Sequence, residues 1–212
     1  MQNRPLSNRR IANVAIFFTW AMLIVYFFQV ILNYIYEVAG PLFVAEDMSA
    51  FLKFTALYLV ATLSIVVFII IYLIIFLVWF YRAYANLHEV NAMPKYSKSW
   101  AVWSWIIPIV NFYLPFQILK EMYAKTAQLL SDSPERDRLK NGVPTVNIFW
   151  ALFLICIAFD IVYFVSIFPD LSVFFDISMF ILLVPAARYT AKIIDDYAQA
   201  EEQLLSEKGF IC

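Results

Sequence analysis

WAVWSWIIPIVNFYLPFQ, residues 100–117, is the stretch that decides how the rest of the chain is arranged. It has no charged residue and is nearly long enough to cross a bilayer, which takes roughly 20 apolar residues. It also contains Pro108 and Pro115, with Asn111 between them. Proline lacks an amide hydrogen and clashes with the carbonyl four residues earlier, so one continuous helix is not expected. Whether the stretch crosses the membrane or turns back sets the topology.

The composition indicates an integral membrane protein. Of the 212 residues, 64% are hydrophobic and 15% are charged, and the mean hydropathy is +0.77. Soluble domains are about half apolar and about one quarter charged. The net charge of −1 gives no general attraction for nucleic acid. We therefore expect membrane lipids, and no nucleic acid, among the partners.

Four further apolar runs are long enough to be membrane spans. They are predicted at residues 11–36, 54–82, 144–168 and 171–188. Basic residues precede the first run, as in a signal peptide, but the apolar core of a signal peptide has only about 7–15 residues. We therefore interpret this run as a retained span. The whole chain, residues 1–212, is predicted to be one polytopic, all-α membrane domain.

The distribution of basic residues decides whether residues 100–117 cross the membrane. The chain has 15 Lys and Arg. If the stretch does not cross, 14 of them share one side with both termini, whereas a crossing splits them 6 against 9. Basic residues concentrate on the cytoplasmic side of membrane proteins. The pattern therefore favours four transmembrane helices with both termini in the cytoplasm.

The stretch at residues 100–117 is then expected to form an inner-leaflet elbow, either re-entrant or merely interfacial. Three tryptophans at its start suit the headgroup zone. The backbone of residues 108–114, between the prolines, is not expected to be regular helix. Residues 115–130 carry apolar side chains at helical spacing, which predicts an amphipathic helix on the cytoplasmic surface. Residues 188–212 are predicted to be a cytoplasmic tail.

The region around the elbow resembles a known family. The segments are WFYRAYANLHEV, residues 79–90, and KYSKSWAVWSWIIPIVNFYLPFQILKEMY, residues 95–123. The positions that carry the resemblance are Arg82, Asn86, Trp100, Ala101, Trp103, Pro108, Asn111, Pro115, Gln117 and Glu121. Their order and spacing are similar to those of the bacterial integral-membrane family catalogued as domain of unknown function 4328. Leu114 stands where that family often has a basic residue. The resemblance implies a multi-pass protein of the bacterial inner membrane and implies no particular chemistry.

The first candidate site consists of polar residues near the elbow, namely Arg82, Asn86, Asn111, Gln117 and Glu121. Arg82 and Asn86 are four residues apart and therefore lie on one helix face. One interpretation is a structural latch that satisfies the backbone groups freed by the prolines. Another is a polar pocket for a lipid headgroup or other anion, with Lys98 or Lys120 as further counter-charge. In a third, Arg82 simply extends to the lipid phosphates.

A second candidate site is expected toward the outer face. Asp160 and Asp176 fall at similar depth in the third and fourth spans, and Gln29, Asn33 and Glu37 recur every four residues on the first. Carboxyl groups at membrane depth are costly and usually face a bundle interior or a cavity. The cluster is interpreted either as a hydrogen-bond network that fixes helix register or as a site for a cation or protons.

The sequence offers no enzyme signature. It contains one histidine, His88, and neither an HExxH nor a GxSxG motif. Its two cysteines give neither a disulfide framework nor metal-site spacing. We therefore expect no enzyme activity, no cofactor and no metal site.

Two functional classes stay open. The first is a non-enzymatic scaffold or accessory subunit that docks a partner or lipid at its cytoplasmic face. Its tail carries an apolar stripe, Ile194, Tyr197 and Leu204, which suits either a partner helix or the protein's own surface helix. The second is a small transporter or channel, a homo-oligomer, that uses Asp160 and Asp176 as a cation or proton site.

Overall fold

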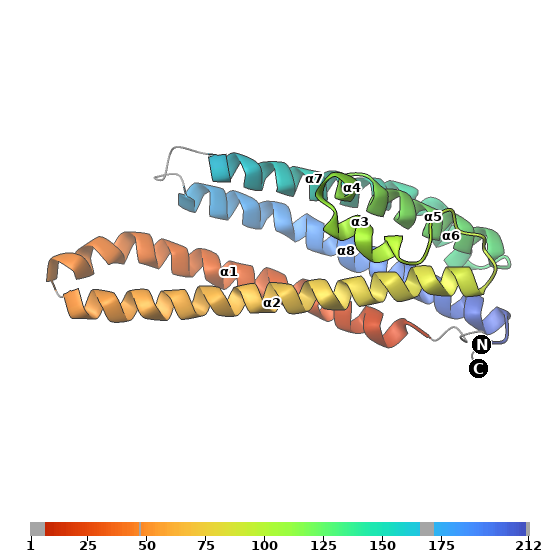
Figure 1. Ribbon diagram of the computed structural model, residues 1–212, viewed down its shortest axis with the longest axis horizontal. Helices are drawn as coiled ribbons and strands as arrows, with labels where there is room; N and C mark the ends of the chain where they lie inside the picture. Colours follow the sequence, from red (N-terminus) through yellow and green to blue (C-terminus); the bar gives the residue numbers. More distant parts are fainter. Residues whose placement is uncertain (1–6, 47, 166–171, 211–212) are drawn as a thin grey trace.

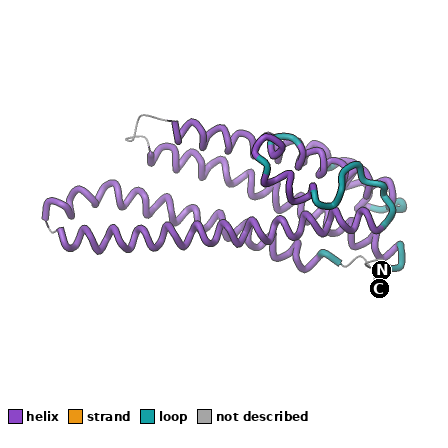
Figure 2. Tube along the Cα trace, in the orientation of Figure 1, coloured by secondary structure: helices purple, strands orange, loops and turns teal. Residues whose placement is uncertain are grey.

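The computed structural model describes residues 7–46, 48–165 and 172–210, and every regular element in them is an α-helix (Figures 1 and 2). Four helices are long and apolar enough to cross a membrane: α1 (Arg9–Glu46), α2 (Met48–Glu89), α7 (Val143–Val165) and α8 (Ser172–Glu207). They match the four predicted spans and indicate a multi-pass membrane protein. The predicted residues 166–168 of the third span and residue 171 of the fourth lie outside the described residues.

Three of these helices run well beyond the predicted spans. At about 1.5 Å per residue, the 42 residues of α2 make a rod of about 63 Å, roughly twice the thickness of a hydrocarbon core. The 36 residues of α8 include Pro185 and continue through Arg188 almost to the end of the tail. The predicted boundary between fourth span and tail is therefore not a break in the helix. From Arg188 onward, charged residues on α8 indicate that this part lies outside the hydrocarbon.

The long helices form two hairpins that pack side by side, α1 with α2 and α7 with α8 (Figure 1). Helix α8 lies against α1 and so joins the two hairpins. The short helices α3 to α6 gather toward the end of the molecule at which α1 begins and α8 ends. We call this the core end, and the opposite end, at the α1–α2 turn, the far end.

The buried core lies at the core end. The largest fully buried side chains come from α2, α5 and α8, and they include Trp79, Phe80, Tyr84, Tyr123 and Tyr197. Along the apolar parts of the spans, by contrast, many large apolar side chains are exposed, including Leu57, Leu63 and Phe174. Apolar side chains that face outward along a span are in contact with lipid in a membrane. One end of the molecule is therefore packed like a soluble helical bundle.

The elbow is built from three helices separated by two breaks. Helix α3 (Trp100–Ile106) ends at Ile107, whose backbone is extended, and α4 (Pro108–Asn111) is a single turn. The second break precedes α5 (Leu114–Leu129). The expectation that residues 108–114 lack regular helix is therefore wrong for residues 108–111 and for Leu114, at which α5 begins. Both prolines lie in the first turn of a helix, where a missing amide hydrogen costs nothing and the fixed φ favours helix.

Helix α5 corresponds to the surface helix predicted at residues 115–130. One of its sides is buried and carries Ile118, Leu119, Met122 and Tyr123. This side packs against α2, α7 and α8 rather than lying free on a membrane surface.

Helix α6 (Pro134–Asn141) was not predicted from the sequence, although its signals are present. The Ser133 hydroxyl accepts a hydrogen bond from the amide of Arg136, as an N-cap does. Pro134 occupies the first turn, in which Glu135 and Asp137 also lie. A proline at the start and acidic side chains near the positive end of the helix dipole both favour helix.

Candidate functional site

The structure does not bring the residues of the predicted elbow cluster together, because their side chains contact different parts of the molecule. The Nδ2 amide of Asn86 donates to Oε1 of Glu201 on α8, at 2.8 Å. The Arg82 guanidinium lies 3.4 Å from the backbone oxygen of Ser7. These two contacts tie α2 to the segment before α1 and to the end of α8, whereas the latch interpretation placed both side chains against the elbow.

Glu121 fastens the α2–α3 loop to α5. Its Oε1 accepts the backbone amide of Lys95 at 2.6 Å, and its Oε2 lies 3.0 Å from the hydroxyl of Tyr84. In the same loop, Asn91 and Met93 have positive φ angles of 58° and 48°. Left-handed backbone at residues other than glycine costs energy and persists only when neighbouring contacts hold it. Glu121 supplies such a contact.

The backbone of the elbow is satisfied locally rather than by the predicted cluster. The amide of Ile107 donates to the carbonyl of Trp103 at 3.1 Å, and that of Asn111 to the carbonyl of Ile107 at 2.8 Å. Half-buried Gln117 lies in the first turn of α5, where its amide donates to Tyr113. The side-chain Oδ1 of Asn111 is buried and has no hydrogen-bond partner among the described residues.

An apolar pocket of about 420 Å³ lies behind the elbow, between it and the spans. We call it the elbow pocket. It is lined by Tyr72, Leu73, Phe76, Leu77, Trp105, Ile106, Asn111, Phe149, Phe153 and Thr190. Ligand pockets in proteins have this size and character, with apolar walls and few polar groups. Asn111, with its unpartnered oxygen, is the polar group that the sequence had already singled out.

Glu201 is a functional candidate that the sequence prediction missed. It is 3% exposed and lies in the core, where loss of hydration raises the pKa of its carboxyl to about 7. Its hydrogen bond from Asn86 and the charge of Arg82 oppose this rise in the pKa. The available signal was its spacing, because it lies four residues after Tyr197 and three before Leu204 on the apolar stripe.

The predicted outer cluster is brought together in part, at the far end. Asn33 on α1 is its centre and donates to Oδ2 of Asp176 on α8, at 2.7 Å. Its Oδ1 accepts from Gln29 at 2.7 Å and from the hydroxyl of Tyr58 at 2.9 Å. The network therefore links α1, α2 and α8 through four polar side chains.

The two other predicted members of this cluster lie at its margins. The Ser172 hydroxyl donates to Glu37, which extends the polar contact between α8 and α1. Asp160 on α7 is exposed and has no hydrogen bond or ion pair to the part of the chain that the structure describes. The structure therefore does not join Asp160 to the network around Asn33.

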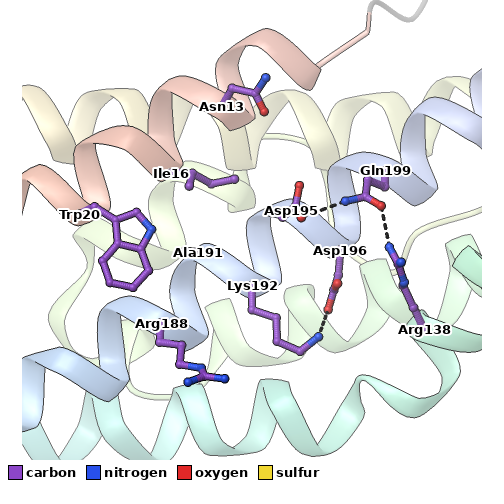
Figure 3. A pocket seen from close by; sticks show the side chains of 10 residues that line it. All are labelled: Asn13, Ile16, Trp20, Arg138, Arg188, Ala191, Lys192, Asp195, Asp196 and Gln199. Carbon is purple, nitrogen blue, oxygen red and sulfur yellow. Dashed lines mark hydrogen bonds and ion pairs between the residues drawn. The ribbon is translucent and has the colours of Figure 1, made fainter.

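A polar groove between α1, α6 and α8 is a further hollow that the sequence prediction missed (Figure 3). Its volume is about 740 Å³, and it is open along one side of the bundle. The groove is lined by Asn13, Ile16, Trp20, Arg138, Arg188, Ala191, Lys192, Asp195, Asp196 and Gln199. Residues from three helices contribute, so the sequence carries no local signal for it. No group of three or more His, Cys, Asp or Glu side chains placed to hold a metal ion is found among the described residues.

Comparison with protein families gives a match to the domain of unknown function (DUF4328) over residues 44–197. The match covers α2 to α7 and more than half of α8, including the whole elbow. The chain belongs to the DUF4328 family. No curated protein and no solved structure matches it.

The candidate sites of this DUF4328 protein differ in whether their residues lie within the matched range. The elbow pocket lies entirely within the matched residues. The polar groove takes Asn13, Ile16 and Trp20 from α1 and Gln199 from the end of α8, and all four lie outside the match. Glu201 lies outside it as well.

Proposed function

We propose that this DUF4328 protein is a non-enzymatic membrane protein that docks a lipid at the cytoplasmic face of the bacterial inner membrane, with the elbow as the docking element. The proposed orientation puts the core end in the cytoplasm. Support comes from the basic residues, since 14 of 15 lie on the side of the termini when residues 100–117 do not cross. The start of α1 and the end of α8 both lie at the core end (Figure 1).

The elbow enters the inner leaflet as a re-entrant segment in this proposal. Its large apolar side chains support this, since Ile109 is 86% exposed and Trp103 and Tyr113 are more than half exposed. Clusters of exposed apolar residues mark surfaces that meet a membrane or another protein. The break at Ile107 allows the chain to turn within the leaflet, because its backbone hydrogen bonds are made locally.

The elbow pocket carries the proposal. It lies between the elbow and helices that cross the membrane, and its walls are apolar except for a few groups such as Asn111. The buried oxygen of Asn111 accepts a hydrogen bond readily, since a buried polar atom without a partner is costly. The ligand that fits is an inner-leaflet lipid with an apolar chain and a hydroxyl or amide donor near its polar end.

Native mass spectrometry of the purified protein, with its retained lipids, tests this proposal. Leu77→Phe narrows the elbow pocket and Asn111→Leu removes the acceptor, so both variants are expected to retain less lipid. Leu63→Phe makes the same enlargement on an exposed part of α2 and serves as the matched control. Equal lipid retention in the two pocket variants and the control, with all of them folded, would refute lipid docking at the elbow.

Docking of a partner helix on the tail stripe is not part of the proposal. Ile194, Tyr197 and Leu204 are all at most 3% exposed and pack in the protein's own core. The sequence left open whether a partner helix or the protein's own surface helix covers this stripe, and in the structure the protein's own helices cover it. A partner protein or a second copy would therefore have to bind elsewhere.

A cation or proton site at the far end is the second candidate function. Asp160 favours it, because an exposed carboxyl on a membrane-spanning helix is costly in lipid and requires water or a bound cation. Cation and proton flux into vesicles that contain the protein measures this activity. Full activity in both Asp160→Asn and Asp176→Asn would exclude these carboxyls as the transport site and leave the Asn33 network as a structural element. Absence of flux in the wild-type protein would remove the transport hypothesis itself.

A further inference from the structure

The polar groove between α1, α6 and α8 has an excess of positive charge that its own acids do not neutralise. Oδ1 of Asp195 accepts a hydrogen bond from the guanidinium of Arg9 at 2.8 Å, and the other carboxylate oxygen accepts one from the side-chain amide of Gln199. Asp196 is paired with Lys192 at 2.7 Å. Both carboxylates are therefore occupied by cations of the protein itself.

Two arginines of the groove stay available for a ligand. Arg188 is exposed and makes no ion pair with any other residue that the structure describes. Arg138 donates one hydrogen bond to Gln199, at 2.6 Å, and is also exposed. A guanidinium has five N–H donors in a fork that matches phosphate oxygens. The half-exposed ammonium of Lys192 lies in the same groove, as Figure 3 shows.

The position of the groove along the bundle corresponds to the membrane surface. Arg188 is the first charged residue after the apolar part of α8, and Trp20 lines the same hollow from the antiparallel helix α1. Tryptophan and the first basic residue beyond a span both concentrate at the level of the lipid headgroups. Basic pockets between membrane helices on the cytoplasmic side bind anionic headgroups.

We propose that the polar groove binds an anionic phospholipid headgroup, with its phosphate held by Arg188 beside Lys192 and with Arg138, near Gln199, as further positive charge in the same groove. This inference relies on the orientation in the proposed function, but it concerns a second site, on other residues than the elbow pocket. It differs from the sequence-based interpretation centred on Arg82. That guanidinium is directed to the backbone of Ser7 and lies close enough to Glu201 to affect its carboxyl.

The test uses the full-length protein in detergent, titrated with phosphatidylglycerol or phosphatidylcholine and analysed by native mass spectrometry. The double variant Arg138→Gln/Arg188→Gln removes two cations without breaking an ion pair among the described residues. We expect its preference for phosphatidylglycerol to fall by at least about tenfold, since each cation at a membrane surface favours anionic lipid. The affinity for phosphatidylcholine should change little.

Lys140→Gln/Lys208→Gln is the matched control, because it removes the same charge from exposed positions outside the groove. An equal loss in this control, or no loss in the arginine variant, would overturn the inference. Competition by millimolar glycerol phosphate would assign the groove to a soluble phosphate compound and so overturn the lipid assignment. Asn111→Leu should leave the phosphatidylglycerol preference intact. A failure of the elbow proposal can therefore be distinguished from a failure of this one.

Discussion

At the scale of single residues, Glu201 has the environment least expected from its surroundings in the sequence. It follows a run of polar and acidic residues in the tail, yet it lies in the core against Asn86. Burial removes hydration from its carboxyl, and the side-chain amides of Asn86 and Asn8 and the charge of Arg82 compensate only in part. The pKa of Glu201 therefore rises to about 7. The folded chain therefore holds the Glu201 proton more tightly than the unfolded chain does.

The free energy of unfolding should depend on pH through this group. Ionisation of Glu201 lowers the free energy of unfolding as pH rises from about 4.5, the ordinary pKa of a glutamate, to about 7. Above that pH the loss of stability is constant. Glu201→Gln keeps an acceptor for Asn86 and removes the titration. The variant should match the wild type near pH 4.5 and exceed it by about 3 kcal/mol at pH 8, at about 1.4 kcal/mol per pKa unit.

Denaturation in mixed micelles at several pH values measures this difference. The exposed neighbour Glu202 provides the control: Glu202→Gln keeps the Glu201 carboxyl and removes only a minor contribution to its raised pKa, so stability should still fall with pH as in the wild type. A pH-independent difference between Glu201→Gln and the wild type would contradict the assignment.

Sequence reasoning singled out several polar residues but did not identify the partners that the structure gives them. Arg82 and Asn86 share a helix face, which the spacing predicts, whereas their partners lie on α8 and near the N-terminus. These partners lie more than 70 residues away in the sequence, and a single sequence does not show which distant residues are in contact. Asn33 and Asp176 were placed at the same end because span depth can be counted in residues.

At the scale of elements, the sequence predicts that the elbow interrupts the helix, but it does not predict where the helices of the elbow begin and end. Two prolines seven residues apart exclude a continuous span. The same prolines start α4 and α5, because a proline is as well suited to begin a helix as to end one. Residue types alone do not decide between these outcomes. The packing of α5 against the core does.

The junction between α6 and α7 depends on a close approach at Gly142. A Cβ atom there would lie 2.7 Å from Cε1 of Tyr123 and 2.9 Å from the carbonyl oxygen of Arg138. Gly142→Ala should therefore destabilise the fold by about 1–3 kcal/mol through overpacking. Thermal denaturation, followed by helical circular dichroism, should show a lower midpoint.

Gly209 separates this packing effect from the general effect of adding a methyl group. It has a φ of +72° and no atom within 4 Å of its would-be Cβ, so Gly209→Ala strains only the last turn of α8. Its cost should stay near about 1 kcal/mol. If the two alanine variants unfold at the same temperature, the contact with Tyr123 does not limit this junction.

At the scale of the whole molecule, the core is displaced to one end of the bundle. The proposed topology makes that end cytoplasmic, and cysteine labelling in intact cells tests it. With Cys156 and Cys212 replaced, Leu52→Cys at the far end should react with an impermeant maleimide added outside. Ser206→Cys at the core end should react only after the membrane is opened. The reverse pattern would invert the topology and place the polar groove at the outer face.

The overall architecture was the most predictable feature of the chain. Four helices match the predicted spans, because long apolar runs have few alternatives to a membrane helix. The compact core was not predicted, since it combines the ends of α2 and α8 with the short helices. In the sequence those ends lie outside the predicted membrane spans, and nothing in the sequence pairs them with each other.

The placement of this core also affects how the chain is made. Leu204 and Leu205, which fill the core beside Tyr197, follow Tyr84 by about 120 residues. At about 5–20 residues per second, the ribosome reaches them roughly 6–24 s after Tyr84. During that interval the aromatic side chains at the end of α2 have no complete core in which to pack. The nascent chain therefore exposes this hydrophobic surface to the insertion machinery until translation is almost finished.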